Sequence, residues 1–331
     1  MTTIKSVAEK AGVSIASVSR VINGTVARGE TEERVWKAIK ELDYQPNSAA
    51  RALKVRKSEQ ICLSFDDLGN PAYVMMTRGV GQALSSTEYR LVLSSAFSSV
   101  DEIVKHLETM GRGFADGLII SPIYSDARIT TLLSRLQIPV VVVGTLPNGI
   151  DVDNVWVDSA AGVATAVEHL KETGRKKIGF LNGPVATNPG KKRVAAFLNA
   201  MDSNSLKLTP TSVIQADAFS PEAAYSALKE CSKLSNFDSI VCANDQLAAG
   251  LMKFCFENKI NIPADLAVVG IDNTDLASLL RPTLTSIDLH AEKRGSIAAQ
   301  MMLDRLSNPD RPSQQIVVEP TLVIRESTNK K

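Results

Sequence analysis

Residues 3–24 read TIKSVAEKAGVSIASVSRVING, and this stretch predicts two short helices joined by a tight turn. The apolar residues of the first helix recur at three- and four-residue spacing, at Ile4, Val7, Ala8 and Ala11. Gly12 follows as a C-terminal stop, and Ser14 can cap the second helix. That second helix is expected to end near Asn23 and to bury Ile15, Val18 and Val21 or Ile22. Together they form a helix-turn-helix unit.

A third helix, from about Glu30 to Leu42, completes a small predicted bundle. Its inward-facing residues are Val35, Ala38, Ile39 and Leu42. Residues 27–32 read ARGETE, so no serine stands at the usual cap position. We therefore expect Gly29 to be the N-cap and Glu32 to occupy the third helical position.

The exposed face of the second helix has small residues near its start and a cation one turn later, namely Ala16, Ser17 and Arg20. Small residues let a helix enter the DNA major groove, where arginine can bind guanine through two hydrogen bonds. The alternative is a helical bundle with no nucleic-acid role. Charge favours DNA, because residues 1–60 hold 11 basic and 7 acidic side chains although the whole chain has a formal net charge of only +1.

Residues 48–55 predict a short hinge helix after Pro46, with Asn47 as its N-cap. About eight residues do not hold a helix alone in water. The segment presents an apolar side chain between cations, at Arg51, Leu53 and Lys54. Such an arrangement suits a wedge in the DNA minor groove; the alternative is that Leu53 packs on the rest of the chain.

Residues 3–24, with YQPN at 44–47 and ARAL at 50–53, resemble the headpiece of the lactose-repressor/galactose-repressor (LacI) family of bacterial transcription regulators. The resemblance implies that the second helix reads the major groove, that Leu53 enters the central step of the operator, and that Lys54 reaches the minor groove. The candidate DNA-binding residues are Ser14, Ile15, Ala16, Ser17, Arg20, Asn23, Arg51, Leu53 and Lys54.

From Ile61 onward, short apolar runs alternate with amphipathic stretches. Nine strands are predicted, at residues 61–65, 91–94, 117–121, 140–143, 155–157, 178–181, 213–215, 239–242 and 268–271. Most follow the previous one by the length of a strand–helix–strand step, which predicts two doubly wound α/β lobes with parallel sheets. The expected domains are an all-α headpiece at 1–57 and a body at 58–331. Within the body, the N-lobe spans about 58–158 and 290–318, and the C-lobe about 159–289 and 319–331.

Polar residues recur at the carboxyl ends of these strands, at Asp66-Asp67, Asn244-Asp245 and Asp272-Asn273, and Gly144 follows another. Ligands bind at the carboxyl ends of open parallel sheets. Carboxylates and amides suit ligands rich in hydroxyl groups. Each residue alone is a common turn-former, but four clusters at equivalent strand ends predict a cleft.

GNPAY at 69–73, ANDQ at 243–246, VGIDN at 269–273 and RPTLTSI at 281–287 look like the effector-domain signatures of the same family. Bodies of that family resemble periplasmic sugar-binding proteins, with three crossovers and the effector between two lobes. The resemblance gives these candidate effector-binding residues: Ala72, Tyr73, Asp158, Lys191, Arg193, Phe219, Asn244 and Asp272. Phe219 would be a platform for a ring. Lys191 stands where arginine is common, and it leaves room for an acidic or phosphorylated ligand.

Several classes of protein are disfavoured by composition. No apolar run approaches the roughly 18 residues of a membrane span, and the N-terminus has no apolar core of a secretory signal. The four cysteines, which are expected to be buried and reduced as in a cytoplasmic protein, are Cys62, Cys231, Cys242 and Cys255. His106, His169 and His290 lie far apart, so neither a metal nor a cofactor is expected.

The sequence thus predicts a cytoplasmic, nucleoid-associated transcriptional regulator, most simply a repressor. Its expected partners are a pseudo-palindromic double-stranded DNA operator, a small-molecule effector such as a sugar, sugar derivative or nucleoside, and a second copy in a homodimer. A solute-binding protein would explain only the body. A sugar-modifying enzyme on the same fold would need a nucleophile, a metal or a phosphate loop, and no G-x-x-x-x-G-K-[ST] or G-x-S-x-G occurs.

Overall fold

The computed structural model describes residues 2–22, 29–45, 57–95, 99–147, 149–231 and 234–329. The chain divides into two compact units, residues 1–58 and 59–331, each of which is described by itself. The predicted hinge helix at 48–55, with Arg51, Leu53 and Lys54, lies outside the described residues, as does Asn23. In the part that is described, no helix is both long and apolar enough to cross a membrane.

In its described residues the N-terminal unit has three helices, α1 (Ile4–Ala11), α2 (Ile15–Ile22) and α3 (Glu30–Glu41). Their apolar faces form one core of Val7, Ala8, Ala11, Val18, Val21, Val35 and Ala38. The prediction that Ile15 is buried is wrong, because 46% of this residue is exposed. As the first residue of α2, it stands at the helix end, outside the cluster that Val18 and Val21 enter.

The predicted end of α1 and the predicted starts of α2 and α3 are confirmed, whereas the predicted end of α2 near Asn23 lies outside the described residues. Gly12 has a left-handed φ of 64°, and the Arg34 guanidinium donates to the Ala11 carbonyl at 2.5 Å, where a side chain on Gly12 would collide with it. The Ser17 amide donates to Ser14 Oγ at 3.1 Å at the start of α2. Gly29 is the N-cap of α3, which places Glu32 at its third position.

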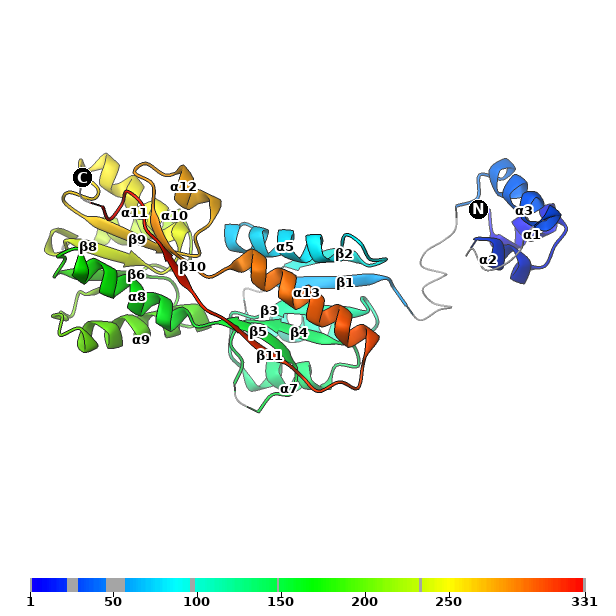
Figure 1. The fold of residues 1–331 in the computed structure, drawn as a ribbon, viewed down its shortest axis with the longest axis horizontal. Helices are drawn as coiled ribbons and strands as arrows, with labels where there is room; N and C mark the ends of the chain where they lie inside the picture. Colours follow the sequence, from blue (N-terminus) through cyan, green and yellow to red (C-terminus); the bar gives the residue numbers. More distant parts are fainter. Residues whose placement is uncertain are drawn as a thin grey trace. The chain divides into compact units, whose positions relative to one another are not determined.

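The first lobe of the body is built on a six-stranded sheet with strand order β11-β5-β4-β3-β1-β2, all parallel (Figure 1). The strands are β1 (Gln60–Phe65), β2 (Arg90–Ser95), β3 (Gly117–Ser121), β4 (Val140–Val143), β5 (Asp153–Val157) and β11 (Gln315–Val318). The helices of this lobe are α5 (Pro71–Leu84), α6 (Val100–Met110), α7 (Ala127–Arg135) and α13 (Ala291–Ser307).

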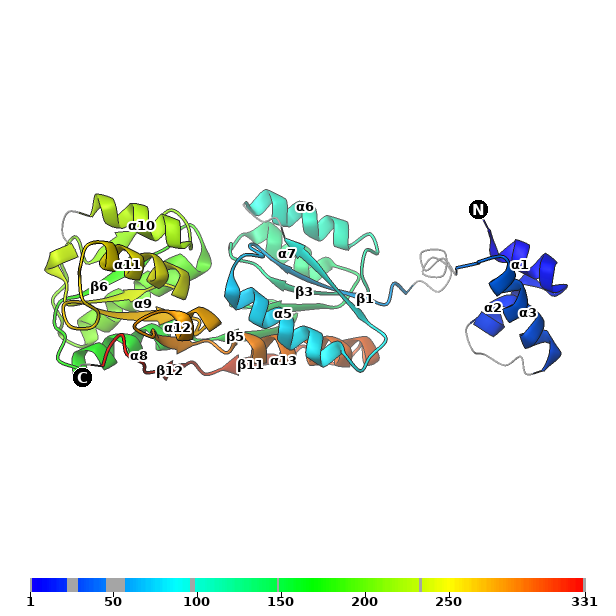
Figure 2. The same cartoon turned by 90° about the horizontal axis from the view of Figure 1, so that it is seen from above.

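Alternate strand residues of this lobe face opposite layers of helices, as the two-residue period of a strand requires. Leu63 and Ile119 pack with α5 and α13, whereas Cys62 and Leu118 pack with α6 and α7. Figure 2 shows the sheet between these two helix layers. Both faces are therefore buried, which is why the strands read as continuous apolar runs.

The second lobe repeats the plan with strand order β12-β10-β9-β8-β6-β7, in which only β12 is antiparallel. The strands are β6 (Ile178–Asn182), β7 (Val213–Gln215), β8 (Ser239–Cys242), β9 (Ala267–Ile271), β10 (Thr285–Asp288) and β12 (Thr321–Val323). The helices are α8 (Ser159–Glu172), α9 (Asn188–Ser203), α10 (Pro221–Glu230), α11 (Asp245–Glu257), α12 (Asp275–Leu279) and a 3₁₀ turn, Leu234–Asn236.

The chain passes between the two lobes after β5, after β10 and after β11, all within described residues (Figure 1). All nine predicted strands are present, within two residues at either end. The strands β10, β11 and β12 were not predicted. Each is only three or four residues long and is held by pairing with a strand distant in sequence.

The helices α5 and α13 cross in close contact at a pair of glycines. A Cβ on Gly79 would lie 2.0 Å from the Glu292 carbonyl oxygen, and one on Gly295 would lie 2.3 Å from that of Met76. These glycines are needed because the two backbones approach too closely for any side chain.

A buried ion-pair network fixes the return of the chain to the first lobe. Asp153 opens β5 and is 1% exposed. Its carboxylate accepts from Arg305 at 2.9 Å, from Arg311 at 2.8 Å and from the Gln314 amide at 2.9 Å. One aspartate therefore joins the end of α13 and the start of β11 to β5, the strand next to β11 in the sheet.

Replacing this aspartate should be costly. Asp153→Ala leaves the positive charges of two largely buried arginines without their partner. We therefore expect the free energy of unfolding to fall by about 3–5 kcal/mol, as measured by chemical denaturation. Asp101→Ala is the matched control, because Asp101 pairs with Arg128 at 2.8 Å on the exposed surface, and its removal should change stability little. Equal losses in the two variants would contradict the assigned role of Asp153.

Candidate functional site

The outer face of α2 presents the predicted DNA-reading residues together. Ser14, Ile15, Ala16 and Arg20 are exposed, and Ser17 is half-buried. The Arg20 Nε donates to the Ala16 carbonyl at 3.4 Å, a long contact, and the side chain is exposed. The helix thus offers small side chains at its start and a cation one turn later.

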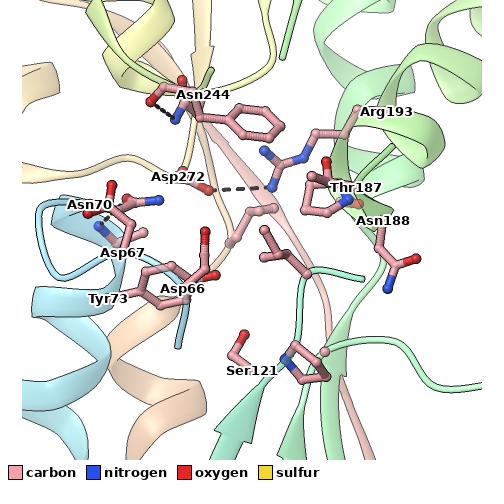
Figure 3. Close-up of a pocket in the computed structure, with 18 of the residues that line it drawn as sticks. Asp66, Asp67, Asn70, Tyr73, Ser121, Thr187, Asn188, Arg193, Asn244 and Asp272 are labelled. Carbon is pink, nitrogen blue, oxygen red and sulfur yellow. Dashed lines mark hydrogen bonds and ion pairs between the residues drawn. The ribbon is translucent and has the colours of Figure 1, made fainter. Parts of the chain in front are cut away.

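A cavity of about 620 Å³ lies between the two lobes of the body. This volume is in the range of sites for small ligands. Residues at the carboxyl ends of strands from both sheets line it, as Figure 3 shows for Asp66, Asn244 and Asp272. Of the residues predicted to bind an effector, six line this cavity: Ala72, Tyr73, Arg193, Phe219, Asn244 and Asp272.

Two of the predicted effector-binding residues, Lys191 and Asp158, are not among those that line the cavity. Lys191 is exposed on α9, whereas Lys192 and Arg193 line the cavity, because each helical step turns the side chain by about 100°. The Asp158 carboxylate is the N-cap of α8, where it accepts from the amides of Ala160 and Ala161 at 3.0 and 3.1 Å. Its negative charge acts on Lys192, which does line the cavity.

Asp272 is the most constrained carboxylate of the cavity. It is 7% exposed and has a left-handed φ of 103°, which is unusual outside glycine. Burial raises its pKa, and the positive charges of Arg193 and Arg294 oppose this shift. Arg193 Nη2 lies 3.6 Å from the carboxylate, and Nη1 donates to the Ala243 carbonyl (Figure 3). Asp272 and Arg193 therefore present an acceptor and a donor side by side.

A second aspartate, Asp245, stabilises the loop that carries Asp272 through hydrogen bonds. Its carboxylate accepts from the Thr274 amide at 2.7 Å, the Thr274 hydroxyl at 2.9 Å and the Ser286 hydroxyl at 2.6 Å. Ser286 Oγ also accepts from the Asn273 amide at 3.0 Å. Burial raises the pKa of Asp245 from its ordinary value of 3.8 to about 7, and the charge of Asp272 adds to this effect.

Phe219 and Asn244 form one unit on the wall of the second lobe. Asn244 caps α11 by accepting from the Leu247 amide at 2.8 Å, and it donates to the Phe219 carbonyl at 3.4 Å. The Phe219 ring covers Gly183, where a Cβ would lie 2.4 Å from it. Asn244 therefore positions the aromatic ring, and its amide keeps one N–H for a ligand.

On the wall of the first lobe, Tyr73 lies parallel to Phe65 at 4.7 Å between ring centroids. Burial raises the pKa of its hydroxyl well above the ordinary value, and the charge of Asp66 adds to this effect. Tyr73 therefore acts in this cavity as a neutral hydrogen-bonding group.

Several lining residues were not among the predicted effector-binding residues, namely Asp66, Asn70, Ser121, Thr187, Asn188, Lys192 and Arg294. Asp66 was visible as a polar residue after the first strand. Arg294 gave no signal, since it lies inside α13 and enters the cavity only through the packing of that helix. Among the described residues no group of three or more potential metal ligands is present. The prediction of four buried cysteines is wrong for Cys231, which is half-buried.

Residues 3–47 match the family model described as bacterial regulatory proteins, lacI family. Residues 167–328 match the model of a periplasmic binding protein-like domain. The two matches fall in the helical unit and in the two-lobed body, respectively.

The HTH-type transcriptional repressor PurR of Erwinia tasmaniensis is 34% identical to the chain over 99% of this chain and 97% of that relative. PurR of Proteus mirabilis is 33% identical with the same coverage. The structure of a transcriptional regulator CelR–cellobiose complex is 28% identical, with a TM-score of 0.73 over 99% of this chain and 100% of that one. The lac repressor dimer bound to operator and the anti-inducer ONPF is 24% identical and similar in fold, with a TM-score of 0.86 over 99% of both chains.

The raised pKa of Asp245 predicts a pH dependence of stability. In the unfolded chain its carboxyl releases its proton near pH 4, but in the folded protein near pH 7. Between these values the folded state binds more protons, so its stability should fall as pH rises. Asp245→Asn removes this contribution, and its free energy of unfolding should decline less between pH 5 and 8. Parallel curves for the variant and the unaltered protein in pH-dependent denaturation would contradict the assignment.

Proposed function

Since the chain belongs to the LacI family of bacterial regulatory proteins, it is a DNA-binding transcriptional regulator with a small-molecule effector, and we propose that it acts as a repressor controlled by a sugar-like compound in the cleft. One observation carries the proposal: the same chain has a helix-turn-helix unit and a two-lobed body with a polar cavity between the lobes. Neither an enzyme nor a solute-binding protein accounts for both.

The DNA-reading role falls to the exposed face of α2. Ala16 and Ser17 are small enough for the start of the helix to enter the major groove, and Arg20 reaches a base edge. We assign contacts to Ser14 and Ile15 on the same face, where the exposed Ile15 side chain suits the methyl group of thymine. Asn23, Arg51, Leu53 and Lys54 complete the proposed DNA-binding set from outside the described residues.

The effector role falls to the cavity. Phe219 offers an aromatic face to an apolar ring surface, while Asp272, Arg193 and Asn244 offer hydrogen bonds to hydroxyl groups. Because the cavity walls come from different lobes, a ligand that contacts both walls favours the arrangement in which they are close together. The proposed signal is this change in lobe closure.

We further propose that the protein acts as a homodimer on a pseudo-palindromic operator, because two-fold symmetry in the protein is matched by the DNA site. Its place of action would be the cytoplasm, on the nucleoid. PurR relatives named as repressors, and a lac repressor dimer structure with operator, support this view.

Arg20→Ala should weaken preference for the operator over random DNA by about 1–3 kcal/mol, because a guanine contact is lost. The measurement is fluorescence anisotropy with operator and scrambled duplexes at fixed salt. Lys40→Ala, which removes an exposed cation from α3, is the control and should affect both duplexes alike. An unchanged preference in Arg20→Ala would refute the assignment of α2 as the recognition helix.

Asp272→Asn should lower effector affinity by about ten-fold or more, since a charged acceptor is lost, and should leave operator binding without effector intact. Cell metabolites that alter operator binding can serve as the effector source, fractionated until one active compound remains. A full response of the variant to that compound would remove Asp272 from the effector site.

A further inference from the structure

The wall of the cavity contributed by β1 and α6 is acidic. Asp66, Asp67 and Glu102 line it, and among the described lining residues before position 192 there is no lysine or arginine. Figure 3 shows Asp66 and Asp67 on this side and Arg193 on the other. This wall therefore holds three carboxylates, whereas the lining cations come from α9 (Lys192 and Arg193) and α13 (Arg294).

Asp66 directly follows β1 and lines the cavity together with Tyr73, whose ring stacks on Phe65. Its Oδ1 is buried and has no hydrogen-bond partner among the described residues. A carboxylate with so few donors is costly in a partly desolvated cavity, so a bound molecule that donates to Asp66 is favoured.

In the described part of the chain, no lysine or arginine forms a salt bridge with this carboxylate. The charge that acts most on Asp66 is that of Asp67, which has the same sign, and burial further raises the Asp66 pKa. Arg193 lies 3.6 Å from Asp272 instead. Arg294 donates to the Leu289 carbonyl at 2.8 Å, and the acidic charges nearest to it are those of Asp272 and Asp288.

We propose that the effector carries a protonated amine that binds Asp66, so that the ligand class of this cavity is amino-substituted sugars or polyols rather than sugar acids or sugar phosphates. The inference rests on the proposed effector role of the cavity. An ammonium group supplies a hydrogen-bond donor to the Asp66 carboxylate and a positive charge to this acidic wall. The carbon skeleton would lie on Phe219, with its hydroxyl groups toward Asp272 and Arg193.

The same charges exclude anionic ligands. A carboxylate or phosphate at the end of β1 would face Asp66 and Asp67 at short range in a partly desolvated cavity, where like charges repel strongly. Lys191, the residue that left room for an acidic ligand in the sequence analysis, does not line the cavity. Lys192 lines the cavity, but the nearby negative charge of Asp158 offsets its positive charge.

The test uses the full-length protein and ligand sets that share one skeleton and differ in charge. Glucose, glucosamine and glucuronate form one set. Cellobiose, the β-1,4-linked disaccharide of glucosamine, and cellobionate form another. In calorimetric titrations, the amine of at least one set should bind about ten-fold or more tightly than its neutral counterpart, and the acids should bind more weakly than either. An acid that binds as tightly as the amine, or the absence of binding by any amine at millimolar concentration, overturns the inference.

Asp66→Asn preserves the shape of the side chain and removes its charge. Amine affinity should fall to that of the neutral sugar, while affinity for the neutral sugar stays within about three-fold, which also shows that the variant is folded. Asp151→Asn removes the same charge from an exposed position of the same lobe and should retain the preference for the amine. A retained preference in Asp66→Asn, or its loss in both variants, overturns the role of Asp66.

The inference and the proposed function can fail separately. If a neutral or acidic compound alters operator binding and amines do not, the regulator stands and the amine class is wrong. If no small molecule from a cell extract alters operator binding, the effector role of the cavity itself is wrong.

Discussion

Parallel strands in one sheet must all end at the same edge, and the body of this protein depends on that constraint. Each lobe collects its strand carboxyl ends, and the polar residues that follow them, along one line. Because the chain passes between the lobes three times within the described residues, the two lines are tied together around one cavity. Residues as distant in sequence as Asp66, Asp272 and Arg294 become neighbours without any local pattern that links them.

The cavity is supported by residues that lie outside it. Asp272 has a left-handed backbone that costs of the order of 1–3 kcal/mol, and the Asp245 carboxylate and Ser286 hydroxyl beneath it stabilise that conformation. The side-chain oxygen of Asn244 accepts a hydrogen bond at the start of α11, and one of its side-chain N–H groups donates to the carbonyl of Phe219. The geometry available to an effector is thus set by hydrogen bonds that the effector never contacts.

Local patterns predicted the helix-turn-helix unit and nine strands because their signals are short-range. Gly12 and Gly29 mark helix ends through backbone geometry and missing side chains, which a sequence displays directly. Ile15 was wrongly predicted to be buried. Helical spacing identifies the apolar face of a helix, but it does not show how far along that face the packed core extends. The strand β10 was missed because three of its four residues are polar, and β11 and β12 were missed because they are short edge strands whose pairing partners are remote in sequence.

The sequence by itself determined the all-α headpiece, the two α/β lobes, their order and six residues of the cavity wall, since these follow from apolar periodicity, turn residues and recognisable motifs. Only the tertiary structure decided that Lys192 rather than Lys191 reaches the cavity, that Asp158 serves as a helix cap, and that Asp66 and Arg294 line the same cavity. The physical reason is the same in each case. A side chain's direction depends on how a helix is rotated against the sheet and which strand ends meet, and packing between distant segments sets both.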